Sequence, residues 1–306
     1  MTLQQMEYIV AVYRLRHFAK AAEHCGVTQP TLSSMIQKLE DELGLRIFDR
    51  SSQPVSPTPA GRLVVEQAWR VLVRANKIKD IVAEAKRSTR GQFRLGILPT
   101  IAPYLLPRFF PRLLAEHPET DVRISEMKTE AVKAALARGE LDAAIVADID
   151  GLDHFDMTEL YFEQFVAYVS ANDVLASTSP VRSSDLTDSF LWLLDEGHCF
   201  RDQIVRFCGI KDGQTSKNVY SLGSIETFMR MVEGGITFIP ELALYQLSDS
   251  QRALVHPFAI PIPTRRVVLL TTRTFVRHSM KKLITDCVRA SVPQQMLKMN
   301  NTEQRV

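Results

Sequence analysis

Two short helices separated by a glycine turn are encoded near the start of the chain by Phe18-Ala19-Lys20-Ala21-Ala22-Glu23-His24-Cys25-Gly26-Val27-Thr28-Gln29-Pro30-Thr31. The Ala-rich first part predicts a helix, and Gly26 ends it. Thr28 is a typical N-cap, and Pro30 suits the first turn of the next helix, whose apolar residues recur at helical spacing up to Leu43. This order of helix, turn and helix predicts a helix-turn-helix motif.

The exposed face of the second helix predicts contact with DNA. Its hydrogen-bonding side chains are long enough to reach base edges and phosphates in a major groove. Any small helical bundle also has such a solvated face, so these positions alone do not exclude a merely structural role. Together with a phosphate contact from the segment that follows, the predicted DNA-binding residues are Gln29, Pro30, Thr31, Ser33, Ser34, Gln37, Lys38 and Arg50.

A turn-rich stretch at residues 51–62 predicts a hairpin wing, and a long helix follows over residues 58–88. Apolar residues in this helix alternate at steps of four and three, and such a heptad seam usually packs against a second helix. We therefore expect a homodimer formed through it, with an ordinary amphipathic helix on its own domain as the alternative. The seam residues are Val64, Ala68, Val71, Ala75, Ile78, Val82 and Ala85.

Short motifs in this N-terminal part resemble those of one bacterial family. The motifs are Phe18-Ala19-Lys20-Ala21-Ala22, Thr28-Gln29-Pro30-Thr31-Leu32-Ser33, Leu39-Glu40-Asp41-Glu42-Leu43-Gly44, Phe48-Asp49-Arg50 and Thr58-Pro59-Ala60-Gly61. Together they resemble the winged helix-turn-helix of LysR-type transcription regulators over the whole N-terminal domain. The resemblance implies a dimerising linker helix and a two-lobed effector domain with the Rossmann-like fold of periplasmic binding proteins.

The rest of the chain alternates between strand and helix patterns, which predicts an α/β domain behind the all-α winged head. Two strands, near residues 165–169 and 267–270, are expected to cross between its lobes. The tail after Pro293 is polar and is expected to be loose. The predicted division is residues 1–58 for the DNA-binding domain, 59–90 for the linker helix and 91–306 for the regulatory domain. Within the last, strands are predicted at 93–97, 122–124, 141–146 and 236–239, and helices at 104–117, 131–137, 224–233 and 277–290.

Two of the four cysteines lie nine residues apart in the stretch Leu194-Asp195-Glu196-Gly197-His198-Cys199-Phe200-Arg201-Asp202-Gln203-Ile204-Val205-Arg206-Phe207-Cys208. We expect Cys199 to begin a helix and to be the more accessible thiol, with its pKa lowered by free backbone N–H groups, the helix dipole, His198 and Arg201. The apolar surroundings of Cys208 should raise its pKa. Nine residues of helix rise about 13.5 Å, whereas a disulfide needs Cα atoms within about 7 Å. The spacing thus describes a redox switch in which the helix unwinds, or else two unrelated buried thiols.

This stretch, together with residues 223–227 and 234–240, resembles the OxyR-type hydrogen-peroxide sensors among the LysR-type regulators. The resemblance implies that peroxide oxidises Cys199 to a sulfenic acid and that Cys208 resolves it to a disulfide. It also implies a hydrogen-bonding peroxide pocket and an arginine that holds the thiolate, although Arg265 and Arg266 are adjacent and the sequence leaves open which one faces the sulfur. For each threonine of the pocket, a cap or turn role is the alternative. The implied pocket residues are Thr100, Thr129, His198 and Arg266.

Composition excludes several classes of protein. No apolar run among the 306 residues approaches the ~20 needed to span a membrane, and the first residues lack a secretory pattern, so a cytoplasmic location is expected. Residues 1–90 carry a net charge of +5 and residues 91–306 a net charge of −3, as expected for a nucleic-acid-binding module joined to another domain. There is no metal-ligand spacing, phosphate loop or hydrolase triad, so no metal, cofactor or enzymatic activity is expected.

The sequence therefore predicts a redox-responsive LysR-type regulator in which a Cys199–Cys208 disulfide remodels the effector domain and alters DNA binding. The expected partners are a double-stranded DNA operator, further copies of the chain in a dimer or tetramer, RNA polymerase and hydrogen peroxide. One alternative is a regulator that binds a small metabolite between its lobes, with both cysteines structural. Another is a thiol peroxidase, which a DNA-binding head disfavours. Cys25 and Cys287 lie in apolar helical contexts and are expected to be structural.

Overall fold

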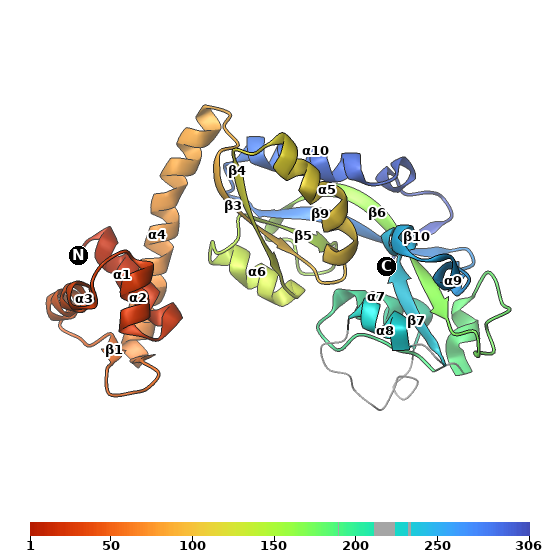
Figure 1. Cartoon of the computed structure of the whole chain (residues 1–306), viewed down its shortest axis with the longest axis horizontal. Coiled ribbons are helices and arrows are strands. Elements are labelled where there is room, and N and C mark those ends of the chain that lie inside the picture. Colours follow the sequence, from red (N-terminus) through yellow and green to blue (C-terminus); the bar gives the residue numbers. More distant parts are fainter. Residues whose placement is uncertain (189, 211–223, 232–233) are drawn as a thin grey trace. The chain divides into compact units, whose positions relative to one another are not determined.

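The computed structural model describes residues 1–188, 190–210, 224–231 and 234–306. The chain divides into two compact units, Met1–Lys86 and Arg87–Val306, each with its own hydrophobic core (Figure 1). The long helix therefore belongs to the same unit as the helix-turn-helix, while the sequence motifs separate it as a linker. Among the described residues, none of the helices is both long and apolar enough to cross a bilayer.

The first unit is a helical bundle with a small wing. The predicted second helix of the motif is confirmed: it begins after Thr28, whose hydroxyl accepts a hydrogen bond from the amide of Thr31 at 3.4 Å, and it ends at Gly44 in the left-handed conformation. Leu32, Ile36 and Leu39 on its inner face are fully buried. The elements are α1 (Leu3–Leu15), α2 (Phe18–His24), α3 (Gln29–Leu43), the antiparallel wing strands β1 (Phe48–Asp49) and β2 (Ser56–Pro57), and α4 (Pro59–Ala85).

Helix α4 packs only its beginning into this core. Val65 and Ala68 are buried against α1, and a capping hydrogen bond from the amide of Gly61 to Thr58 Oγ1 fixes the start of the helix. Further along, the predicted seam residues Ile78 and Val82 are 66% and 51% exposed in the single chain. The apolar stripe thus continues beyond the part that α1 covers.

The second unit is built on one mixed sheet whose long strands run through two lobes. Its order is β4-β3-β5-β9-β6-β7, with β10 pairing β9 and β8 pairing β6. Strands β3, β4 and β5 are parallel, whereas β9 runs antiparallel to both β5 and β6. The strands are β3 (Gly91–Ile97), β4 (Thr120–Glu126), β5 (Ala143–Ala147), β6 (Phe155–Val169), β7 (Ile236–Pro240), β8 (Val255–His256), β9 (Ile262–Thr272) and β10 (Glu303–Arg305).

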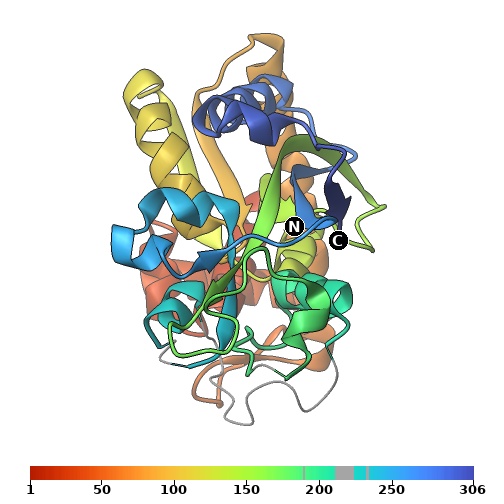
Figure 2. The same cartoon turned by 90° about the vertical axis from the view of Figure 1, so that its right-hand side faces the viewer.

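The two predicted crossing strands are confirmed. The first part of β6 pairs with β9 in the first lobe, and its last part, Phe165–Val169, pairs with β7 in the second. Figure 2 shows the long strands passing from one lobe to the other. The helices are α5 (Ala102–Glu116), α6 (Thr129–Ala137) and α10 (His278–Ser291) in the first lobe, and α7 (Cys199–Cys208), α8 (Ile225–Met231) and α9 (Asp249–Arg252) with the 3₁₀ segments Ser183–Asp188 and Glu241–Gln246 in the second.

The predicted loose tail is wrong. Residues Gln294–Leu297 form a 3₁₀ turn, and β10 pairs in parallel with Ile262–Thr264 of β9. Met296 is buried, which anchors the segment although its composition is polar. The predicted end of a helix at Glu233 lies outside the described residues.

Candidate redox site and DNA-binding surface

Cys199 is the first residue of α7 and Cys208 is the last, so the predicted helix between the two thiols is confirmed. Both are free thiols. The rise of a helix over nine residues is about 13.5 Å, which is well beyond the reach of a disulfide. Oxidation to a disulfide therefore requires α7 to unwind.

The accessibility of the two thiols is the reverse of the expectation. Cys199 is buried with 6% of its surface exposed, whereas Cys208 is half-buried. The reason is the packing of the first turn of α7 onto the crossing strand β6, where the rings of Phe200 and Phe165 lie 4.7 Å apart. Cys25 and Cys287 are also half-buried free thiols, and burial raises the pKa of each.

Burial also overturns the predicted low pKa of Cys199. Desolvation raises its pKa above the ordinary thiol value, and this effect outweighs the stabilising effects of the Arg265 guanidinium, the Thr129 hydroxyl and the Phe200 amide. The backbone amide of Phe200, at the N-terminus of the helix, lowers the pKa of Cys199 as expected, but desolvation raises it by more. The resting sulfur is thus a protonated thiol surrounded by groups that favour its anion.

Thr100 and Thr129 reach this site from the first lobe. Thr100 follows β3 and Thr129 begins α6 after β4, and because β3 and β4 are parallel neighbours, both residues lie at the same edge of the sheet. Both are buried. Thr129 Oγ1 is buried and makes no hydrogen bond to a nitrogen or oxygen atom of the described residues. Its hydroxyl acts on the Cys199 sulfur, where it favours the anion.

The arginine beside the thiol is Arg265, which corrects the prediction of Arg266. Adjacent residues of a strand point to opposite faces, and on β9 it is Arg265 that is fully buried and faces Cys199, with its guanidinium over the Phe200 ring at 5.2 Å. Arg266 instead forms ion pairs with Asp148 and Glu159.

His198 lies beside an ion pair that joins the two lobes. Burial and the nearby Lys128 lower its pKa, although Asp195 acts in the opposite direction. Asp195 receives Lys128 Nζ at 2.9 Å and lies 3.1 Å from His198 Nε2. Lys128 immediately precedes Thr129, so the same turn of the first lobe supplies both a hydroxyl to Cys199 and an ion pair to its flanking loop.

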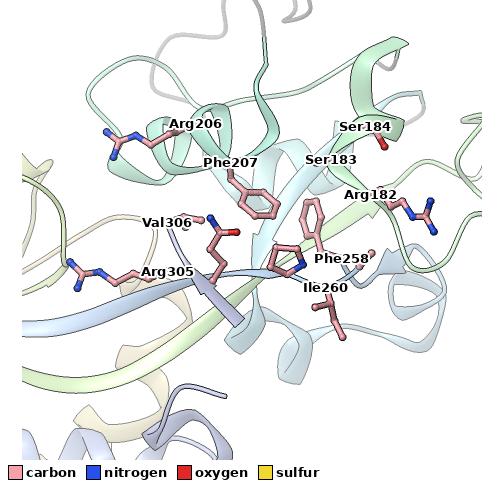
Figure 3. Close-up of a pocket in the computed structure, with 12 residues that line it drawn as sticks. Arg182, Ser183, Ser184, Arg206, Phe207, Phe258, Ile260, Arg305 and Val306 are labelled. Carbon is pink, nitrogen blue, oxygen red and sulfur yellow. The ribbon is translucent and has the colours of Figure 1, made fainter. Parts of the chain in front are cut away.

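The C-terminal end of α7 lies beside a cavity. A hollow of about 460 Å³ is lined by Phe207, Phe258 and the C-terminal strand (Figure 3). The rings of Phe207 and Phe258 meet edge to face with centroids 5.8 Å apart. Burial raises the pKa of Cys208 to about 12, as predicted, and so keeps it unreactive while the helix is intact.

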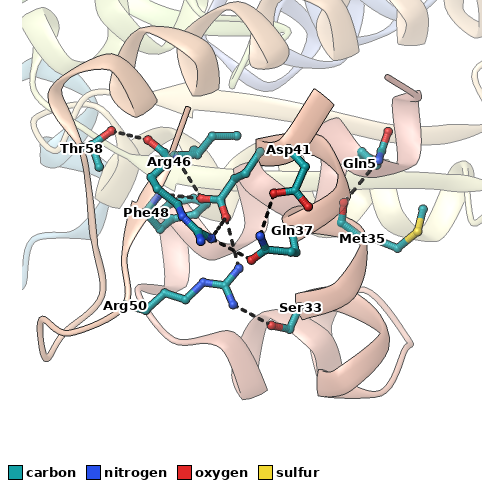
Figure 4. Close-up of polar contacts among 11 residues, drawn as sticks. Gln5, Ser33, Met35, Gln37, Asp41, Arg46, Phe48, Arg50 and Thr58 are labelled. Carbon is teal, nitrogen blue, oxygen red and sulfur yellow. Dashed lines mark hydrogen bonds and ion pairs between the residues drawn. The ribbon is translucent and has the colours of Figure 1, made fainter. Parts of the chain in front are cut away.

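In the first unit, the predicted DNA-binding residues gather on α3 and the start of the wing. Two of them are only half-buried rather than exposed, and these are Ser33 and Gln37. Gln37 contacts Asp41 and Arg46, and Ser33 accepts a hydrogen bond from Arg50 at 3.2 Å (Figure 4). The exposed members of the set are Gln29, Pro30, Thr31, Ser34, Lys38 and Arg50.

Glu40 is the anchor of this surface and was not predicted from the sequence. Its carboxylate is buried and accepts hydrogen bonds from the amides of Ile47 and Phe48 at 2.7 and 3.2 Å. It also forms ion pairs with Arg46 and Arg50, each at 3.2 Å. Glu40 therefore fixes the wing against α3 and holds Arg50 across the surface.

Comparison with known proteins identifies the family. A model described as the LysR substrate binding domain matches residues 86–292, and one described as a bacterial regulatory helix-turn-helix protein of the lysR family matches residues 3–62. The chain belongs to the LysR family of DNA-binding transcription regulators. The predicted fold class, a helix-turn-helix head with a two-lobed α/β domain, is confirmed.

Similar proteins of this family are named hydrogen peroxide-inducible genes activator or OxyR. The hydrogen peroxide-inducible genes activator of Dickeya chrysanthemi is 34% identical over 302 residues, 98% of this chain and 99% of that protein. The DNA-binding transcriptional dual regulator OxyR of Escherichia coli K12 is 33% identical over 292 residues, 95% of each chain. Among solved structures, a full-length OxyR variant from Pseudomonas aeruginosa is 35% identical, covers 95% of this chain and 99% of that one, and has a TM-score of 0.76.

Three residues of the redox site were not singled out from the sequence. Glu163 is the lone carboxylate in an apolar part of β6, a pattern that predicts a buried partner without naming it. Lys128 and Asp195 are ordinary charged residues whose pairing depends on how the two lobes meet. No local pattern identifies such a contact.

Proposed function

We propose that this LysR-family regulator senses hydrogen peroxide through Cys199 and transmits the signal by a Cys199–Cys208 disulfide. The observation that carries the proposal is a buried thiol at the start of α7, beside the Thr129 hydroxyl and the Arg265 guanidinium, with a second thiol at the far end of the same helix. Relatives named hydrogen peroxide-inducible genes activator support this hypothesis over that of a metabolite-binding regulator.

The chemistry has two balanced steps. The Cys199 sulfur, deprotonated as peroxide binds, attacks one peroxide oxygen and the O–O bond breaks. Sulfenic acid forms, and the leaving hydroxide takes up the thiol proton as water. Once α7 has unwound, the Cys208 thiol attacks the sulfenic sulfur, an S–S bond forms and a second water leaves.

The pocket residues have separate tasks in the first step. Thr100 and Thr129 provide hydroxyls that both donate and accept hydrogen bonds, as peroxide requires. Arg265 and the Phe200 amide stabilise the sulfur anion as it develops. His198 completes the polar lining, and its burial together with the nearby Lys128 lowers its pKa and so favours the neutral imidazole.

Unwinding of α7 provides the link to DNA. The helix packs on β6, which continues from the second lobe into the first, so its loss changes the packing along a strand that both lobes share. In an assembly of two or four chains joined through α4, that change alters the spacing of the DNA-binding heads on the operator and their contact with RNA polymerase. We place this assembly in the cytoplasm, with no catalytic turnover as its function.

Thiol trapping in a Cys208→Ser variant tests the proposal. After a low dose of peroxide, we expect a stable sulfenic acid at Cys199, detected by a dimedone adduct in peptide mass spectrometry, and no intramolecular disulfide. An unmodified Cys199 at doses that oxidise the wild-type protein would contradict the proposal. Saturable binding of a small organic ligand, with normal induction in a Cys199→Ser variant, would favour the metabolite-binding alternative.

The two neighbouring arginines provide a matched comparison. Arg265→Met removes the cation beside the sulfur, and we expect the rate of Cys199 oxidation to fall by roughly tenfold or more because the loss of a favourable charge contact costs at least ~1.4 kcal/mol. Arg266→Met removes ion pairs on the other face of β9 and should leave the rate within about twofold of wild type. Equal effects of the two substitutions would refute the assignment of Arg265.

A further inference from the structure

Arg265 has a second partner that the reaction itself does not use. Glu163 and Arg265 are directly opposite each other on the antiparallel strands β6 and β9. Glu163 Oε2 accepts hydrogen bonds from Arg265 Nη2 at 2.6 Å and Nε at 2.8 Å, and both side chains are 1% exposed. Because both side chains are excluded from water, this two-point hydrogen bonding is strong and fixes the plane of the guanidinium.

This pairing fixes where the remaining N–H groups of Arg265 point. Nη1 donates to Thr100 Oγ1 at 3.2 Å and Nη2 donates to the Thr100 carbonyl at 3.0 Å. Since the Thr100 hydroxyl already accepts a hydrogen bond, its own hydrogen is left to be donated elsewhere. The rings of Phe165 and Phe200 flank the guanidinium at 5.8 and 5.2 Å and limit any other orientation.

The carboxylate is itself held from the other side. Its Oε1 accepts a hydrogen bond from the Leu242 amide at 3.2 Å, so it is tied to the segment that follows β7. The guanidinium therefore lies between two groups that bind its charge, the Glu163 carboxylate and the Cys199 sulfur. The other titratable groups that act on this pair or on the sulfur are Tyr104, Tyr161, Glu241 and Asp202.

We propose that Glu163 is a positioning residue for the reaction of Cys199: it holds Arg265 against Thr100 and limits how strongly the guanidinium stabilises the sulfur anion. The thiol consequently stays protonated until peroxide enters, and the Thr100 hydroxyl stays oriented as a donor. The proposal rests on the proposed function for its biological meaning, but its physical content concerns only Glu163, Arg265 and the sulfur.

The test is the pH profile of Cys199 alkylation by iodoacetamide in the full-length reduced protein, followed by peptide mass spectrometry. In Glu163→Gln the guanidinium has only the sulfur as an anionic partner, so we expect the midpoint to fall and alkylation at pH 7 to rise at least fivefold. Glu163→Asp keeps the charge and should restore the wild-type profile. A Glu163→Gln profile that is unchanged, or shifted to higher pH, would overturn the proposal.

Glu159→Gln is the matched control. Glu159 lies on the same strand as Glu163 but pairs with Arg266 at 3.7 Å on the opposite side of the sheet. The pH profile of Cys199 alkylation in this variant should therefore match that of the wild-type protein. An equal shift in this variant would also overturn the proposal.

A double variant keeps the proposal testable if Glu163→Gln does not fold. Glu163→Met with Arg265→Met replaces a buried ion pair by apolar side chains of similar size, which proteins often tolerate. Removal of both charges should move the midpoint to higher pH than in wild type, and an unmoved midpoint would refute any action on the sulfur through Arg265. Because alkylation needs no peroxide, a wild-type protein whose Cys199 resists peroxide would refute the proposed function and leave this inference standing.

Discussion

At the scale of the residue, the central feature is the opposition between burial and stabilising contacts at Cys199. The sulfur lies at a helix N-terminus beside an arginine, which would normally give a reactive thiolate. Burial destabilises the thiolate more than these contacts stabilise it, so the pKa of Cys199 is raised. A small polar ligand such as peroxide partly replaces the lost hydration of the sulfur and so favours deprotonation when the oxidant is present.

The pH dependence of Cys199 reactivity follows from this balance. A raised pKa means that the thiolate fraction is small at neutral pH and grows as the pH passes the ordinary thiol value of about 8.5. We expect the rate of alkylation of Cys199 in the reduced protein to keep rising above pH 8.5, whereas the same cysteine in urea-unfolded protein should follow the ordinary profile. A plateau reached by pH 7 in the folded protein would show that the contacts outweigh burial.

At the scale of the element, α7 is held in its helical form by contacts that unwinding must break. Gln203, in the middle of the helix, is 5% exposed and donates from Nε2 to the carbonyl of Val306 at 2.8 Å. Val306 follows β10, and its own amide donates to the Thr264 carbonyl of β9 at 3.1 Å. The C-terminal strand thus ties α7 to the shared sheet in the reduced state.

Removal of the hydrogen bond between Gln203 and Val306 should favour the disulfide. Gln203→Met keeps the size of the side chain but loses the donor, and a typical hydrogen bond contributes about 1 kcal/mol net, or roughly fivefold in equilibrium. We therefore expect the ratio of disulfide to dithiol, measured by gel shift after thiol alkylation in a glutathione redox buffer, to rise about fivefold. Arg206→Met serves as the control because the Arg206 side chain is 73% exposed and its ion pair with Asp150 is long, at 3.7 Å. The ratio in this variant should stay unchanged. A lower ratio of disulfide to dithiol in Gln203→Met would contradict the proposal that this hydrogen bond stabilises the helical, reduced form.

At the scale of the whole molecule, function requires that a change in the second unit reach the DNA-binding heads. Helix α4 leaves a stripe of apolar side chains uncovered in the single chain, including Val71, Ile78 and Val82. Charged residues flank this stripe, the pattern of a helix that pairs with another helix. The stripe supports a dimer formed by two α4 helices.

Placing a charge in the stripe tests this assembly. Ile78→Asp would bury two uncompensated carboxylates in a symmetric dimer, and we expect the dimer to be weakened roughly tenfold or more, as measured by analytical ultracentrifugation. Operator binding should weaken with it, because each head alone makes half of the contacts. Lys79→Asp, an adjacent exposed position outside the stripe, should leave the association constant near the wild-type value. A dimer that survives Ile78→Asp unchanged would place the interface elsewhere.

The sequence by itself determined what depends on neighbours along the chain. The helix-turn-helix follows from the glycine turn, the Thr28 cap and the spacing of Leu32, Ile36 and Leu39, and the sequence also predicted that a helix begins at Cys199. The separation of Cys199 from Cys208 follows from the geometry of that helix. These features are local, so a single chain read in order is enough to predict them.

Only the tertiary structure decided what depends on how distant segments meet. The choice of Arg265 over Arg266 follows from which face of β9 is turned toward the lobe junction, and two adjacent identical side chains give no local signal for that choice. The raised pKa of Cys199 and the pairing of Glu163 with Arg265 depend on the desolvation produced where β6, β9 and α7 pack together. The burial of Cys199 results from contacts with segments throughout the unit. It raises the pKa of the thiol by more than the helix N-terminus, which the sequence could predict, lowers it.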